Sequence, residues 1–185
     1  MEREIALAGG CFWGAEKYLS SLRGVTHTEV GYANGKTECP TYEQVKHEGT
    51  GHAETVLVHY DDELMPLRTL LSLFFLIIDP VAVDRQGGDV GHQYRTGIYY
   101  TDPADEPVAR EALQALQAQA EGKIAVELLP LSDFWRAEEY HQAYLDKNPA
   151  GYCHVPLAAI AWAKTVNPMT FDPAEAPQFA HFGGH

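Results

Sequence analysis

The sequence is short of basic residues. Thirteen Lys and Arg stand against 26 Asp and Glu, which gives a formal net charge of −13 at neutral pH. A surface this acidic repels the phosphates of nucleic acids and the headgroups of anionic lipids. We therefore expect neither nucleic acid nor a membrane surface among the partners.

Long apolar runs and cysteines are also scarce. The most apolar segment, residues 64–78, is shorter than a bilayer span and contains Arg68, so a buried helix is expected there. The opening MEREIALAGG has an acid at position 2 and does not resemble a signal peptide. Three cysteines, without the spacing of a disulfide scaffold, favour a reducing, cytoplasmic setting in which thiols are more often catalytic than structural.

The usual cofactor and metal patterns are missing as well. The nine histidines form no HExxH pattern, the cysteines form no CxxC pattern, and no GxGxxG opens a helix after a strand. The closing HFGGH, residues 181–185, is more typical of a flexible tail than of a metal site. We therefore expect no metal and no bound nicotinamide or flavin.

What is present indicates one α/β domain. A chain of 185 residues suffices for a single packed domain. The pattern predicts a mixed sheet covered by helices within residues 1–166, followed by a Pro-rich, flexible tail over 167–185. Strands are expected at 4–9, 25–33, 53–60, 96–100 and 124–129, and helices at 13–22, 41–47, 66–78, 102–122 and 137–145. Residues 80–95 read as a long irregular loop, which in a compact domain is often functional.

Cys11 lies between two glycines and two aromatic residues, in GGCFWG, where the first strand should turn into the first helix. Backbone N–H groups at a helix N-terminus favour a thiolate, so this position predicts a lowered pKa and a nucleophilic sulfur. The alternative is a small buried hydrophobic residue after a glycine turn, which is the commoner role of a lone cysteine.

The same stretch, GCFWGAE, resembles the signature of the A-type peptide methionine sulfoxide reductases. Four more blocks resemble that family in the same order: GYANGKTECPTYEQV, TGHAET, QGGDVGHQYRTGIYY and AEEYHQAYLDKNPAGYC. The resemblance spans residues 5 to about 155. It implies reduction of methionine-S-sulfoxide, free or in proteins, as a repair activity recycled by thioredoxin or a similar dithiol protein.

The resemblance also implies a role for individual residues. Cys11 would be the nucleophile that becomes a sulfenic acid, and Glu54 would be the acid that protonates the departing oxygen. Tyr42 and Tyr94 would hold that oxygen, and Asp89 would help to shape the same site. Phe12 and Trp13 would cradle the S-methyl group of the substrate. Without the resemblance, Glu54 would be read as a solvated residue of an alternating strand.

Cys153 matches the family's resolving cysteine, which implies a Cys11–Cys153 disulfide. Cys39 departs from the asparagine common in relatives and is either a second resolving thiol or, as we favour, a bystander. Gly88 stands where relatives commonly have Asn, which leaves the hydrogen bonding of that loop open. A monomer is the default expectation.

Two other functions remain open from the residues alone. GGCFWG faintly resembles papain-like hydrolases, with His141 or His92 as the base. A redox sensor whose Cys11 oxidises without reducing a substrate is the third possibility, and such a sensor would have no use for Glu54.

Overall fold

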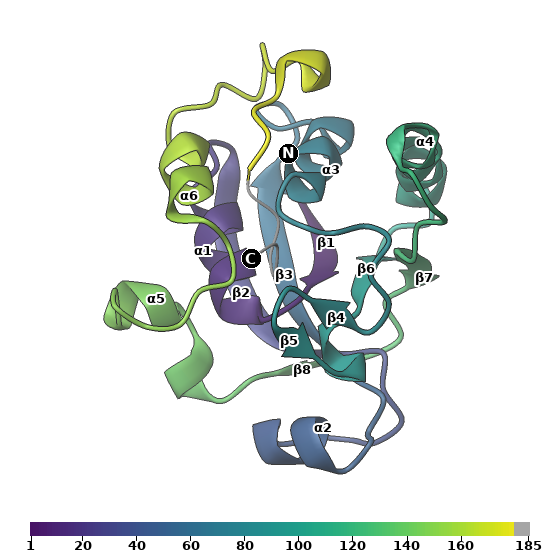
Figure 1. Ribbon diagram of the computed structural model, residues 1–185, viewed down its shortest axis with the longest axis vertical. Coiled ribbons are helices and arrows are strands. Elements are labelled where there is room, and N and C mark those ends of the chain that lie inside the picture. The colour runs from purple at the N-terminus through teal and green to yellow at the C-terminus, as the bar shows by residue number, and fades with distance from the viewer. Residues whose placement is uncertain (180–185) are drawn as a thin grey trace.

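The computed structural model describes residues 1–179 and places a six-stranded mixed sheet at the centre of the molecule (Figure 1). The strand order is β7–β6–β1–β3–β2–β8. β6 and β7 run parallel, and the other four neighbouring pairs are antiparallel. This confirms the α/β fold class with a mixed sheet in a single domain. The strands of the sheet are β1 (Glu2–Gly9), β2 (Val25–Ala33), β3 (Ala53–Asp61), β6 (Thr96–Tyr100), β7 (Glu127–Pro130) and β8 (Phe134–Arg136).

Four of the helices lie in the connections between these strands, and α5 and α6 follow the last strand, β8. Thr41 caps α2 in a capping box with Gln44, as the sequence predicts. The helices are α1 (Phe12–Ser20), α2 (Tyr42–His47), α3 (Leu67–Phe75), α4 (Asp105–Gln119), α5 (Tyr144–Lys147) and α6 (Leu157–Ala163), with 3-10 turns η1 (His92–Tyr94), η2 (Glu139–His141) and η3 (Pro173–Glu175).

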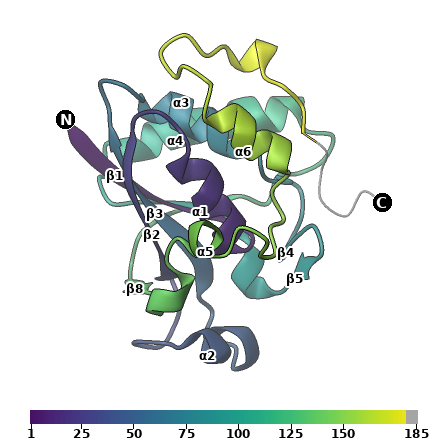
Figure 2. The same ribbon diagram turned by 90° about the vertical axis from the view of Figure 1, so that its left-hand side faces the viewer.

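The main core lies between the sheet and the helices α1, α3, α4 and α6, all of which contribute buried residues to it. Figure 2 shows α6 beside α1, with α3 and α4 above them. Ile5 of β1 and Val56 of β3 are among the strand residues on this side. On the other side, Ala6, Ala8 and small residues of β2 and β3 form a second, smaller cluster with Tyr99. The predicted helical cover therefore lies over the face that carries the main core.

The predicted helix over residues 137–145 is wrong. This segment follows β8, contains the 3-10 turn η2, and reaches the four-residue helix α5 only at Tyr144. Gln142 bonds both the N–H and the carbonyl of Val30, and the Ala143 N–H donates to Glu16 at 2.8 Å. Ala143 also has a φ of +48°, outside the right-handed helical region. Tertiary hydrogen bonds override the helical periodicity of this segment.

The long irregular loop contains a small hairpin. Within residues 80–95, β4 (Arg85–Gln86) and β5 (Asp89–Val90) pair across the glycines at 87 and 88, and η1 follows. A Cβ at Gly88 would meet nothing within 4 Å, so the position has room for the Asn that is common in relatives.

The segment after Asn148 carries a helix that the sequence reading lacked. Residues of α6, among them Ala159 and Ala163, are fully buried. The flexible tail beyond residue 167 stays a prediction, although the ring of Phe171 lies 5.8 Å from that of Trp162. His181 and His185 lie outside the described residues. Among the helices of residues 1–179, none is both long and apolar enough to cross a membrane.

Candidate active site

Three strand ends meet where the candidate site lies. β1 is flanked by antiparallel partners on both sides, β3 and β6. The end of β1 therefore lies beside the beginnings of both neighbours, as the pairing of Gly9 with Thr96 shows. Cys11 lies two residues after the end of β1, Glu54 is the second residue of β3, and Tyr94 lies two residues before the start of β6. Residues far apart in the sequence are thus brought to one edge of the sheet.

Cys11 occupies the N-cap position of α1, and it is buried, with 8% of its surface exposed. Gly10, at φ +82°, makes the preceding turn, and a Cβ there would lie 2.8 Å from the Cβ of Gln86. The expected lowering of the thiol pKa is wrong for this structure. Burial and the nearby Glu54 raise the pKa of Cys11, while a hydrogen bond from the Trp13 backbone N–H opposes that rise.

Glu54 is the most buried carboxyl group near Cys11, with 1% of its surface exposed. Its Oε1 accepts the backbone N–H of Phe12 at 3.2 Å, which ties the carboxyl group to the first turn of α1. Burial raises the pKa of Glu54 to about 8, against an ordinary value of 4.5. At neutral pH the group is therefore mostly a carboxylic acid that can donate a proton.

Tyr42, Tyr94 and Asp89 surround this acid. Burial raises the pKa of both tyrosines, and the nearby Glu54 carboxyl group raises it further, while a hydrogen bond with Tyr94 opposes the rise at Tyr42. Asp89 in turn raises the pKa values of Glu54 and Cys11. Burial keeps both tyrosine hydroxyls protonated, with the pKa of Tyr42 raised to about 12. The site therefore presents neutral O–H donors around a buried thiol.

Phe12 and Trp13 differ in their surroundings. Phe12 is buried, and its ring lies 5.7 Å from Tyr32 and 5.1 Å from His141. Trp13 is partly buried and stacks on Tyr144 at 3.7 Å, with a 9° angle between the rings. These contacts make an aromatic wall beside the Cys11 turn.

His141 and Tyr144 belong to this wall. The sequence analysis considered His141 only as the base of a hydrolase, and it did not single out Tyr144. Trp13 Nε1 donates to His141 Nδ1 at 2.9 Å, and burial lowers the pKa of His141. Since Nδ1 already accepts the indole N–H, the ring is poorly placed to act as the base of a hydrolase. The signal available was the shared block AEEYHQAYLDKNPAGYC, which carries both residues together with Cys153.

Cys153 lies against the first turns of α1. A Cβ added to Gly14, three residues after Cys11, would lie 3.1 Å from Cys153 Sγ. Tyr152 donates from its hydroxyl to Asp89 Oδ2 at 2.9 Å, so the segment also contacts the β4–β5 hairpin. Cys39 is an exposed residue of the β2–α2 loop, and His92, the other candidate base, is exposed and paired with Asp84 at 2.8 Å.

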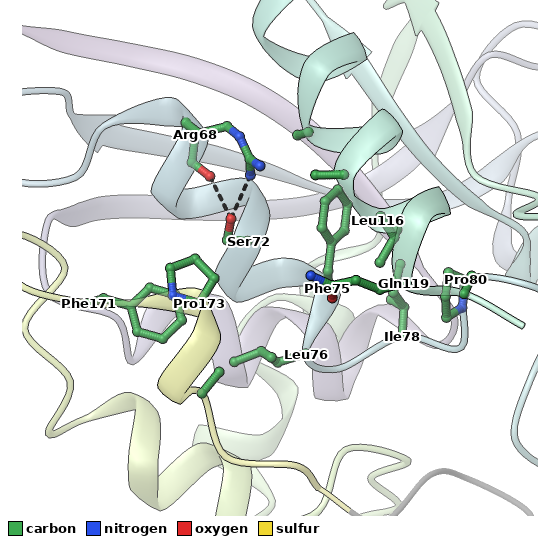
Figure 3. Close-up of a pocket in the computed structure, with 14 residues that line it drawn as sticks. Arg68, Ser72, Phe75, Leu76, Ile78, Pro80, Leu116, Gln119, Phe171 and Pro173 are labelled. Carbon is green, nitrogen blue, oxygen red and sulfur yellow. Dashed lines mark hydrogen bonds between the residues drawn. The ribbon is translucent and has the colours of Figure 1, made fainter.

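One hollow with a mostly apolar lining lies away from the Cys11 site. It has a volume of about 270 Å³ and separates α3, α4 and the segment around Phe171 and Pro173 (Figure 3). The Arg68 guanidinium on its wall donates to Ser72 at 2.7 Å. None of its described lining residues belongs to the Cys11 site. Within residues 1–179, no group of three or more His, Cys, Asp or Glu is arranged to hold a metal ion.

A buried thiol beside a buried carboxylic acid, with a second thiol against the same helix, defines this α/β protein as a thiol-dependent oxidoreductase. The family model for peptide methionine sulfoxide reductase matches residues 3–169. The chain is 54% identical over 164 residues to the peptide methionine sulfoxide reductase MsrA of Lachnoclostridium phytofermentans, covering 89% of this chain and 99% of that protein. The MsrA of Clostridium perfringens is 53% identical over 155 residues, which cover 84% of this chain and 99% of that protein.

Solved structures agree with the sequence comparison. The reduced form of Mxr1 from Saccharomyces cerevisiae superposes with a TM-score of 0.78 at 39% identity, covering 82% of this chain and 88% of that one. Methionine sulfoxide reductase A of Corynebacterium diphtheriae gives a TM-score of 0.76 at 38% identity, covering 82% of this chain and 77% of that one. The chain belongs to the peptide methionine sulfoxide reductase family, A type. It is a thiol-dependent peptide-methionine (S)-S-oxide reductase, an activity that repairs oxidised methionine.

Proposed function

We propose that Cys11 is the residue that takes the oxygen from methionine-S-sulfoxide. Its sulfur attacks the sulfoxide sulfur, the S–O bond of the substrate breaks, and the oxygen ends on Cys11 as a sulfenic acid while methionine leaves. The oxygen takes its proton from Glu54 and the Cys11 thiol proton replaces it on Glu54, so atoms, protons and electrons balance. Both free and protein-bound methionine sulfoxide are included as substrates.

The buried, protonated Glu54 is the observation that carries this mechanism. Sulfoxide sulfur is a weak electrophile until its oxygen is protonated or strongly hydrogen-bonded. Glu54 has a pKa near 8, so at neutral pH it holds a proton beside Cys11. A redox sensor without a substrate would gain nothing from this costly buried acid.

The neighbouring residues have supporting roles in the proposal. The hydroxyls of Tyr42 and Tyr94 hold the sulfoxide oxygen, and Asp89 helps to shape the site. Phe12 and Trp13 provide apolar surface for the S-methyl group, which is small enough to lie against an aromatic wall.

The sulfenic acid is resolved by Cys153. Its thiol attacks the Cys11 sulfur, the S–S bond forms, and the hydroxyl leaves with a proton as water. A dithiol protein of the thioredoxin class then reduces the disulfide. One yeast relative, at 26% identity and a TM-score of 0.55, has been solved in complex with Trx2, which supports this partner. The proposal also includes that the protein is a cytoplasmic monomer and that it holds no resident cofactor.

The experiment compares turnover of the two methionine sulfoxide epimers by the wild type, Cys11→Ser, Glu54→Gln and Cys153→Ser. With dithiothreitol, the wild type and Cys153→Ser should reduce the S epimer. Cys11→Ser should be inactive, and Glu54→Gln should be slower by about a hundredfold or more, the contribution of a general acid. With thioredoxin, Cys153→Ser should lose activity. Retained thioredoxin activity would transfer the resolving role to Cys39, and an active Cys11→Ser would overturn the mechanism.

A further inference from the structure

His154, the residue after Cys153, lies against the turn that carries Cys11. It has 8% of its surface exposed, and its Nε2 lies 3.1 Å from the carbonyl oxygen of Gly9. A carbonyl can only accept, so Nε2 carries the hydrogen of this bond. Burial lowers the pKa of His154 to about 4, which keeps the ring neutral at physiological pH.

The glycines on both sides of Cys11 make room for this ring. A Cβ at Gly10 would lie 3.0 Å from His154 Nε2, and a Cβ at Gly14 would lie 3.1 Å from His154 Nδ1. The Gly14 position would also meet Cys153 Sγ at 3.1 Å. The imidazole therefore spans the backbone from Gly10 to Gly14, and the resolving thiol lies against the same glycine.

The segment has a second attachment, which is more exposed. The Tyr152 hydroxyl donates to Asp89 at 2.9 Å, but Tyr152 is 50% exposed. A hydrogen bond in contact with water restrains a chain less than a buried one does. Val155 also packs into the main core two residues after Cys153. Of the two side-chain hydrogen bonds made by the residues on either side of Cys153, the one from His154 is the buried one.

We propose that His154 is a positioning residue for the resolving step: its bond to the Gly9 carbonyl holds Cys153 against the Cys11 turn before the disulfide forms. This inference rests on the proposed role of Cys153. In that step the Cys153 sulfur displaces the hydroxyl of the Cys11 sulfenic acid as water. Holding the two sulfurs close accelerates such a step, while transfer of oxygen from the substrate does not require Cys153 to be in place.

The test is a single turnover without reductant, using one equivalent of methionine-S-sulfoxide. Methionine release reports the first step, and the Cys11–Cys153 peptide found by mass spectrometry reports the second. In His154→Leu, which keeps an apolar side chain but no donor, methionine should form at the wild-type rate. The disulfide should form about ten- to a hundredfold more slowly, with a sulfenic acid that a 1,3-dione reagent traps.

Three further variants sharpen the comparison. His154→Gln has an amide N–H that can reach the Gly9 carbonyl, and it should recover most of the second rate. His154→Asn is shorter and should not, which repeats the test with a polar side chain if His154→Leu fails to fold. His27→Leu makes the same chemical change at an exposed histidine of β2 and should leave both rates unchanged.

Two results would overturn the inference. The first is disulfide formation at the wild-type rate in folded His154→Leu and His154→Asn. The second is an equal slowing of methionine release and disulfide formation, which would indicate a merely structural role. The Cys153→Ser variant, measured in the same way, tests the role of Cys153 separately from the role of His154. If Cys153→Ser still forms an intramolecular disulfide, the resolving role of Cys153 fails first, and the role of His154 falls with it.

Discussion

Glu54 is a carboxylic acid on a face of β3 that otherwise carries Val56, Val58 and Tyr60, all buried. Strand alternation places these four side chains on the same side of the sheet. The alternation of side chains along β3 therefore indicated that Glu54 lies on the buried face, although a glutamate in an alternating strand is usually solvated. Its role as a proton donor could be inferred only from the resemblance to the family, because the alternation within β3 does not show that Glu54 lies near Cys11.

This burial should cost stability. The folded-state pKa of Glu54, about 8, exceeds its ordinary value of 4.5, so the folded state binds more protons between those two pH values. Its contribution to stability is therefore lost progressively as pH rises from about 4.5 to 8. Glu54→Gln keeps an acceptor for the Phe12 N–H and removes the ionisation. It should stabilise the protein by about 1–3 kcal/mol at pH 7.

Thermal unfolding of both proteins at pH 5 and pH 7 measures this effect. The gain in Tm for Glu54→Gln should be larger at pH 7 than at pH 5. A gain that does not depend on pH would mean that the carboxyl group is not protonated in the folded state.

The same proton should govern the rate of the first step. Below pH 8 the Glu54 carboxyl can donate to the sulfoxide oxygen, and above that pH it is ionised. We expect the single-turnover rate of methionine release to fall as pH rises through about 8. Glu54→Gln should be slow throughout and lack this falling limb. The same limb in the variant would assign it to another group.

At the scale of elements, the apolar periodicity predicted the first four strands of the sheet closely, placed the start of β7 three residues too early and missed β8. β1, β2, β3 and β6 lie within two residues of their predicted ends. The segment over 137–145 has helical spacing, yet its polar groups bond outward. Glu138 accepts from Tyr32 and from the backbone of Tyr42, and Gln142 bonds β2. Bonds between such distant residues leave no local pattern in the sequence, so they could not be predicted.

At Gly14, the stability of α1 and the packing of residues 153–155 favour different amino acids. In the first turns of α1, alanine would favour the helix by about 1 kcal/mol over glycine. Its Cβ would, however, press on Cys153, His154 and Val155, each with an atom at 3.1 Å. In Gly14→Ala we expect methionine release to continue, while disulfide formation slows by about tenfold because the resolving segment is displaced.

Gly122→Ala is the matched control, because its Cβ would meet only ordinary contact at 3.7 Å. Both variants are measured by single turnover with peptide mass spectrometry. Unchanged disulfide formation in Gly14→Ala would mean that the resolving segment does not need its place against α1.

At the scale of the molecule, the order of the strands creates the site. Because β3 and β6 both run antiparallel to β1, Glu54, Tyr94 and Cys11 gather at one edge although they are distant in sequence. The sequence predicted five of the six strands of the sheet but neither β8 nor the strand order, since pairing depends on long-range packing. The candidate residues were therefore found by resemblance, and their convergence became visible only in the fold.

The segment around Phe171 tests whether the chain beyond residue 167 belongs to the folded domain. Phe171 packs edge-on against Trp162 of α6 and lines the hollow between α3 and α4 (Figure 3). If this packing holds in solution, Phe171→Ala should cost about 1–3 kcal/mol from lost burial and ring contact. At about 2–4 °C per kcal/mol for a protein of this size, differential scanning calorimetry should resolve the drop in Tm.

Met169→Ala, at a residue 59% exposed, is the control and should leave Tm unchanged. Reduction of the S epimer should stay at the wild-type rate in both, because neither residue lies at the Cys11 turn. Equal Tm values for the two variants would instead favour the loosely ordered tail that the proline-rich sequence predicts.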